Sequence, residues 1–147
     1  MSERTISSMF DEDHDRLDAL FKSFQTLKRK DFPRAKRAFL EFKTGMRRHV
    51  AWEEDVMFPL WEKKSGQTGG GPTIVMRREH QEIQDCLESI DRKLQAQNPE
   101  TDHEEEILLD LVDRHYMSEE EVLYPEMDHL MTPEEREAAV RAIEKIA

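Results

Sequence analysis

The sequence lacks several features, and each absence excludes a class of protein. Its 147 residues include a single cysteine, Cys86, so the chain cannot build an internal disulfide framework. No apolar run reaches the ~18–20 residues that a membrane-spanning helix needs, and the first residues contain no apolar stretch of the signal-peptide type. Acidic residues outnumber basic ones, 33 against 22, which disfavours nucleic acid and anionic membranes as partners. We therefore expect a cytoplasmic protein.

Glycine and proline are also scarce, with five and six residues, and they gather between segments that have a helical pattern. In these segments apolar residues or histidines recur every three or four positions, which is typical of helices that bury one face. The segments cover about 10–24, 39–60, 76–94 and 108–123. Short links between four long helices predict an all-α, up-down-up-down four-helix bundle that forms one domain over residues 1–147.

Local signals mark where these helices begin and end. Asp31 is a candidate N-cap, and Thr101 with Glu104 three residues later predicts a capping box. Thr132, followed by proline and two glutamates, predicts a short last helix over Pro133–Ile146. We interpret Pro59 and Pro125, which lie near the ends of two of the apolar patterns, as residues that end helices.

The chain contains an internal repeat with an offset of 66 residues. This shift aligns His14 with His80, His49 with His115, Glu53 with Glu119, Glu54 with Glu120, and Pro59 with Pro125. The later helix of each half therefore carries the pattern His-x-x-x-Glu-Glu-x-x-x-x-Pro. The repeat predicts two helical hairpins related by a pseudo-two-fold axis.

Six side chains of the repeat are candidate metal ligands because they occupy the apolar faces of their helices. They are His14, His49, Glu53, His80, His115 and Glu119. Residues four positions apart share one helix face, so each pattern places a histidine beside a glutamate. Unpaired carboxylates are costly to bury, and metal ions remove that cost. Mixed imidazole and carboxylate ligands favour iron, with manganese or zinc as alternatives.

The repeat favours two metal ions over one. We expect each ion to take two histidines, the two glutamates to bridge the ions, and both ions to keep room for a small molecule. Glu54 and Glu120 are either hydrogen-bond partners of the ligand histidines or solvated side chains. Tyr116 and Tyr124 are candidates to hydrogen-bond a metal-bound ligand, although Phe58 stands where the repeat aligns Tyr124.

With these residues the chain resembles hemerythrin-like proteins of the HHE cation-binding family, over about 10–125. The resemblance implies a four-helix bundle around a non-haem di-iron centre with an oxo or hydroxo bridge. Oxygen-carrying hemerythrins have a fifth histidine where this chain has Gln84, and an aspartate where it has Glu120. The four-histidine, two-glutamate set is more similar to the hemerythrin-like domains of iron–sulfur cluster repair proteins and iron-sensing ubiquitin-ligase subunits.

Because the metals keep open positions and the sequence shows no obvious substrate pocket, we expect a protein that binds or senses dioxygen, nitric oxide, peroxide or iron at its metals. The alternative is an oxidoreductase that reduces peroxide or nitric oxide, oxidises ferrous iron, or donates iron for cluster repair. A third interpretation is a structural helical protein with zinc or no metal. The sequence leaves the oligomeric state and the choice between sensing and catalysis open.

Overall fold

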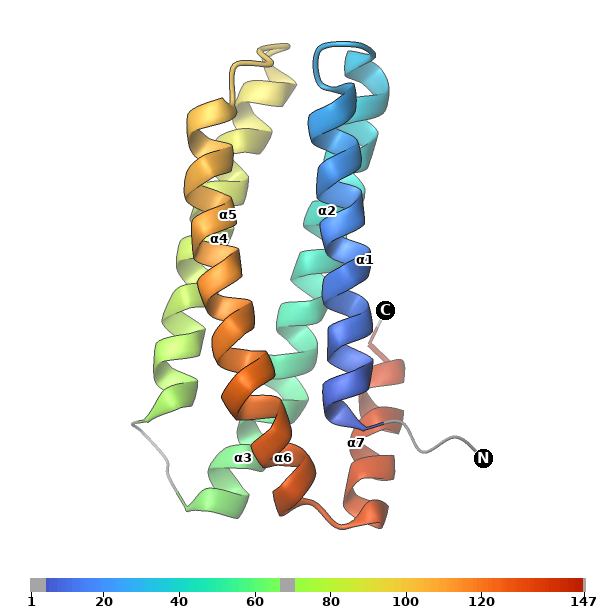
Figure 1. The fold of residues 1–147 in the computed structure, drawn as a ribbon, viewed down its shortest axis with the longest axis vertical. Helices are drawn as coiled ribbons and strands as arrows, with labels where there is room; N and C mark the ends of the chain where they lie inside the picture. Colours follow the sequence, from blue (N-terminus) through green and yellow to red (C-terminus); the bar gives the residue numbers. More distant parts are fainter. Residues whose placement is uncertain (1–4, 67–70, 147) are drawn as a thin grey trace.

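A computed structural model describes residues 5–66 and 71–146, and no strand occurs in these two ranges. Four long helical rods stand side by side and alternate in direction, as Figure 1 shows. This confirms the predicted all-α bundle. In chain order the elements are α1 (Ile6–Leu27), α2 (Phe32–Ala51), the π-helical segment η1 (Trp52–Met57), α3 (Phe58–Ser65), α4 (Pro72–Gln95), α5 (Asp102–Ser118), the π-helical segment η2 (Glu119–Leu123), α6 (Tyr124–Leu130) and α7 (Pro133–Glu144).

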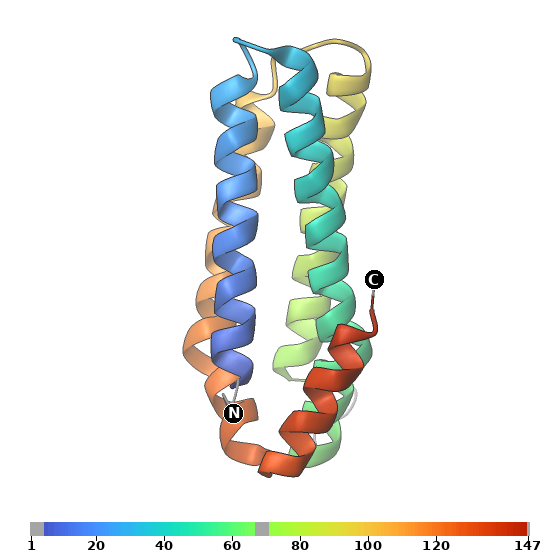
Figure 2. The same cartoon turned by 90° about the vertical axis from the view of Figure 1, so that its right-hand side faces the viewer.

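The helix ends follow local signals at two of the predicted places. The Asp31 side chain accepts a hydrogen bond from the backbone N–H of Arg34 at 3.3 Å and caps α2. Thr132 and Glu135 form the predicted capping box of α7, which ends at Glu144, two residues earlier than expected. The short α7 packs against η1 at the lower end of the bundle (Figure 2).

The predicted capping box at the start of α5 is wrong. Thr101 is the N-cap, but its side chain makes no capping bond and donates instead to Oε2 of Glu105, at 2.6 Å. Glu105 is buried and also accepts a hydrogen bond from the ammonium of Lys28, a buried residue at the end of α1. Lys28 Nζ lies 2.5 Å from Asp102 as well. The Thr101 hydroxyl therefore bonds the buried carboxylate of Glu105 between α1 and α5 instead of capping the helix.

The interpretation of Pro59 and Pro125 as helix-ending residues is also wrong, because both lie at the start of a helix that continues the chain direction. Just before each proline the helix widens into a π-helical segment. The N–H of Phe58 donates to the carbonyl of Glu53, and that of Tyr124 to the carbonyl of Glu119, five residues back. A proline ring crowds the carbonyl four residues earlier, and the wider turn gives it space.

A polar layer divides the core of the bundle into two apolar clusters. Along α1, Phe10 belongs to the lower cluster and Leu17 and Phe21 to the upper one, and the buried His14 lies between them. The other three helices contribute a buried histidine to the same layer (His49, His80 and His115). The bundle therefore holds these four histidines in the middle, between two packed apolar clusters.

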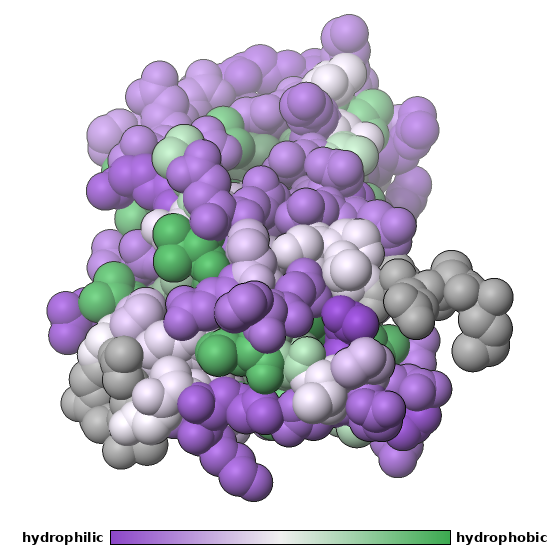
Figure 3. Space-filling model, turned by 60° about the horizontal axis from the view of Figure 1, so that its bottom comes forward, coloured by the Kyte–Doolittle hydropathy of each residue, from purple (hydrophilic) through white to green (hydrophobic). Residues whose placement is uncertain are grey.

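The surface of the described chain is largely polar. The bottom face in Figure 3 shows hydrophobic residues only as small separate areas among hydrophilic ones. The exposed large apolar side chains are Leu40, Val75, Ile107, Met117 and Val122. Within the described ranges, no helix has the length and apolar character required to cross a membrane.

Candidate metal centre

The structure brings together all six side chains that the sequence singles out, and each is at most 4% exposed. The four histidines meet as two pairs, one from each helical hairpin. Nε2 of His14 on α1 lies 3.1 Å from Nε2 of His49 on α2. Nε2 of His80 on α4 lies 3.0 Å from Nε2 of His115 on α5. Each pair thus points two ring nitrogens at one small region of the core.

The two glutamates lie between the histidine pairs, and each directs one oxygen toward each pair. Glu53 places Oε1 2.9 Å from Nε2 of His80 and Oε2 3.9 Å from Nε2 of His49. Glu119 places Oε2 2.9 Å from Nε2 of His115, and its Oε1 lies 3.2 Å from Nε2 of the α1 histidine. Both carboxylates are fully buried. Each glutamate therefore spans the gap between the two histidine pairs.

The other ring nitrogen of each of these four histidines, Nδ1, contacts a carboxylate. The four contacts are His14 with Glu120 at 2.5 Å, His49 with Asp13 at 2.7 Å, His80 with Glu54 at 2.7 Å, and His115 with Glu79 at 2.8 Å. An ionised carboxylate only accepts hydrogen bonds, so the geometry assigns the proton to Nδ1. In the form that binds a cation, the imidazole keeps this Nδ1 proton and offers the lone pair of Nε2.

Two of these carboxylates, Asp13 and Glu79, were missed by the sequence reasoning. Each directly precedes a histidine of the repeat, and the same offset of 66 relates them. That alignment was the available signal. Both contact the histidine of the neighbouring helix in their own hairpin, whereas Glu54 and Glu120 reach across to the other hairpin.

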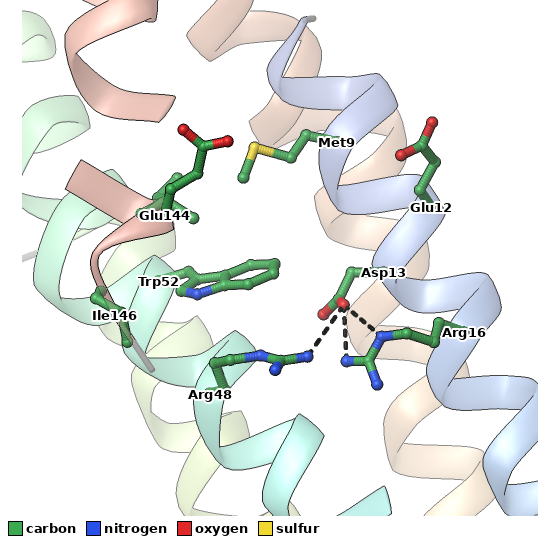
Figure 4. A pocket seen from close by; sticks show the side chains of 9 residues that line it. Met9, Glu12, Asp13, Arg16, Arg48, Trp52, Glu144 and Ile146 are labelled. Atoms are coloured by element: carbon green, nitrogen blue, oxygen red, sulfur yellow. Dashed lines mark hydrogen bonds and ion pairs between the residues drawn. The ribbon is translucent and has the colours of Figure 1, made fainter. Parts of the chain in front are cut away.

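Asp13 connects the histidine layer to a surface hollow of about 380 Å³ (Figure 4). Its Oδ1 accepts from Nε and Nη2 of Arg16, at 3.0 and 2.8 Å, and lies 3.9 Å from Nη2 of Arg48. Burial by itself would raise the pKa of Asp13, but the hydrogen bonds from His49 and Arg16 hold that pKa below its ordinary 3.8. None of the four histidines is among the residues that line the hollow.

The buried glutamates give the centre a negative charge that neutral histidines cannot balance. Burial would lower the pKa of His49, yet Glu53 and the other nearby carboxylates raise it to about 10. The same balance raises the pKa of His115 to about 12, with Glu119 as the largest opposing cause. Oε2 of Glu119 has no hydrogen-bond partner among the described residues, although it lies close to His115. The buried carboxylates of Glu53 and Glu119 therefore need a positive charge beside them.

The donor set fits transition-metal cations. Two overlapping groups made up entirely of buried residues have ligand atoms within 4.8 Å of one another: Glu53, His80, His115 and Glu119 in one, and His14, His49 and Glu119 in the other. Imidazole nitrogen with carboxylate oxygen suits iron, manganese or zinc better than calcium or magnesium, which prefer oxygen alone.

Two tyrosines complete the surroundings. The hydroxyl of Tyr124 lies 2.7 Å from Oε2 of Glu53 and 2.7 Å from Oε1 of Glu119. Burial and these carboxylates keep its pKa well above the ordinary value of 10. Tyr116 stacks on the ring of His14 with a centroid distance of 3.5 Å, and its buried hydroxyl has no hydrogen-bond partner within the described part of the chain.

The family model of the hemerythrin HHE cation binding domain matches residues 5–109. No curated protein and no solved structure matches the chain. The matched residues include His14, His49 and His80, whereas His115 and Glu119 lie beyond them. The internal repeat and the geometry, rather than the family model, point to these last two residues.

Proposed function

The chain belongs to the hemerythrin HHE cation-binding family, and from this premise we propose that it holds two iron ions in its core and binds a small molecule there. The observation that carries the proposal is the pair of glutamates, each of which directs one oxygen toward each histidine pair. When bound, two iron ions supply redox chemistry and open coordination positions for dioxygen, nitric oxide or peroxide.

In this proposal the histidine pairs each hold one ion, and Glu53 and Glu119 bridge the two. The negative charges of these two glutamates leave the pair of divalent ions with a net positive charge. The carboxylates at the four Nδ1 atoms reduce that excess and fix the imidazole rings in orientation. They are Asp13, Glu54, Glu79 and Glu120. Manganese or zinc in the same site is the alternative that metal analysis distinguishes.

The direct test is elemental analysis of freshly purified protein together with its absorption spectrum in air. We expect two iron ions per chain and the near-ultraviolet charge-transfer bands of an oxo-bridged ferric pair. Fewer than one metal ion per chain, even after anaerobic reconstitution with ferrous iron, would contradict the proposal. Zinc as the resident metal would favour a structural role.

Ligand addition separates sensing from catalysis. A sensing or binding protein should change its spectrum with nitric oxide, dioxygen or peroxide and then stop consuming the added molecule. Steady consumption of peroxide or nitric oxide, lost in a Glu53→Ala variant, would instead identify an oxidoreductase.

Asp13→Asn should weaken metal binding without removing a ligand. The amide lacks the negative charge that, through the Nδ1–H of His49, makes this imidazole a stronger ligand. We therefore expect the affinity for the metal to fall roughly 10- to 100-fold. Competition with a chromogenic chelator measures the change. Asp15→Asn, an exposed change two residues away, is the control and should leave the affinity unaltered. Equal affinities in the two variants would show that Asp13 has no role in tuning His49.

A further inference from the structure

The two histidine pairs have different neighbours at one equivalent position. The repeat offset relates Tyr124 to Phe58, and both are fully buried. Both also have the same backbone setting, since each N–H donates to the carbonyl of a glutamate five residues earlier. The two side chains therefore enter the core from matching places, but only Tyr124 brings an oxygen.

That oxygen lies on the side of His14 and His49. It is 3.4 Å from Nε2 of His14 and 3.3 Å from Nε2 of His49. The two carboxylate oxygens within 2.7 Å of it are Oε2 of Glu53 and Oε1 of Glu119, the atoms directed toward this histidine pair. The hydroxyl is therefore surrounded by the four atoms that would hold the first ion.

Among the residues that the structure describes, none brings such an oxygen to the side of His80 and His115. The ring of Phe58 lies parallel to that of His80, with an interplanar angle of 9° and a centroid distance of 5.5 Å. A phenyl ring offers no lone pair to a cation. The donors within reach on this side are two imidazole nitrogens, Oε1 of Glu53 and Oε2 of Glu119.

The position of Tyr124 is fixed by packing. Its ring contacts Phe10 of α1, with a centroid distance of 4.7 Å, and Phe10 in turn packs edge-on against His49 at 5.2 Å. A phenol held this way loses little conformational freedom when its oxygen binds a cation, so binding there is pre-organised.

We propose that the hydroxyl oxygen of Tyr124 is a further ligand of the ion held by His14 and His49, so that the small molecule binds at the ion held by His80 and His115. The proposal rests on the two-metal function above. Tyr124 would hold a ferric ion through its phenolate oxygen, with the hydroxyl proton released to solvent, and the phenolate would supply a negative charge that ferric iron favours. The protein would then occupy the open coordination position of the ion held by His14 and His49. The ion held by His80 and His115 would keep its open position.

The test uses protein loaded with ferrous iron and oxidised by dioxygen in air. We expect a phenolate-to-iron charge-transfer band in the visible range, with tyrosine ring vibrations enhanced by resonance Raman excitation in that band. Tyr124→Phe should abolish both signals and retain two irons per chain, since phenylalanine already occupies the equivalent place. Tyr116→Phe is the matched control and should retain the band.

The equivalent position supplies the second arm of the test. Phe58→Tyr in the Tyr124→Phe background should restore a visible band from the other side of the centre. With azide as the probe, the wild-type diferric protein should bind one anion per chain and Tyr124→Phe should bind two. Phe58→Tyr alone should weaken azide binding at least tenfold, because the new hydroxyl would occupy the open position of the ion held by His80 and His115.

The outcomes separate this inference from the proposed function. Two irons per chain with no visible band, or a band that survives Tyr124→Phe, would overturn the role of Tyr124 while the two-metal site stands. Fewer than one metal ion per chain in the wild-type protein would overturn both. Loss of the band in Tyr124→Phe, with its return in the double variant, would support the proposal.

Discussion

Glu53→Ala is expected to cost the protein at least one of the two metal ions proposed for it and to lower the melting temperature of the metal-loaded form by about 10 °C. Glu53 is fully buried and directs an oxygen toward each histidine pair, so its loss removes a donor from both positions. A metal present at about 1,000 times its dissociation constant stabilises a fold by about 4 kcal/mol, which corresponds to a shift of this size.

Metal analysis and thermal unfolding followed by circular dichroism measure the effect. Asp55→Ala, an exposed change two residues along the same helix, should retain both ions and the wild-type melting temperature. After removal of metal with a strong chelator, the wild-type melting temperature should fall toward that of the variant, because the stabilisation by the metal is then gone from both. A variant that keeps two ions and its melting temperature would refute the bridging role of Glu53.

Lys28→Ala should destabilise the fold by about 3–5 kcal/mol while leaving the metal content unchanged. The ammonium of Lys28 is buried and contacts Glu105 and Asp102 on α5. Glu105 is itself buried, so the substitution leaves a carboxylate in the core with only neutral partners, Thr101 and Gln25. His14 lies about 20 Å away along the axis of α1, so the histidine layer should not respond.

Urea unfolding gives the free-energy change, and metal analysis gives the second readout. Lys30→Ala removes an exposed lysine two residues later and should cost less than about 0.5 kcal/mol. The double change Lys28→Met with Glu105→Leu should recover most of the lost stability, because it removes both buried charges together. If Lys28→Ala unfolds at the same urea concentration as wild type, the buried pair does not stabilise the bundle.

The sequence by itself was sufficient for the helical bundle and for the set of six candidate ligands. Both depend on short-range regularities. Apolar residues at helical spacing fix which face of each helix is buried, and a histidine four residues before a glutamate shares that face. The offset of 66 then identified His115 and Glu119, which the matched family segment does not reach.

Other features depended on how the helices rotate and shift against one another. Glu104 was the expected capping partner of Thr101, but a buried lysine from another helix redirected the hydroxyl to Glu105. Pro59 and Pro125 appeared to be helix ends, because a sequence pattern does not show that a π-helical turn can accommodate a proline within a continuing helix.

The roles of the polar groups around the histidines were decided only in three dimensions. Glu54 and Glu120 were ambiguous in sequence, and Asp13 and Glu79 went unnoticed, yet each contacts a histidine of another helix. The hydroxyl of Tyr124 likewise meets carboxylates from two hairpins. Periodicity along a chain reports which side of a helix faces inward, whereas contacts between helices depend on their axial register and tilt. These are set by the packing of the whole core, and no local pattern records them.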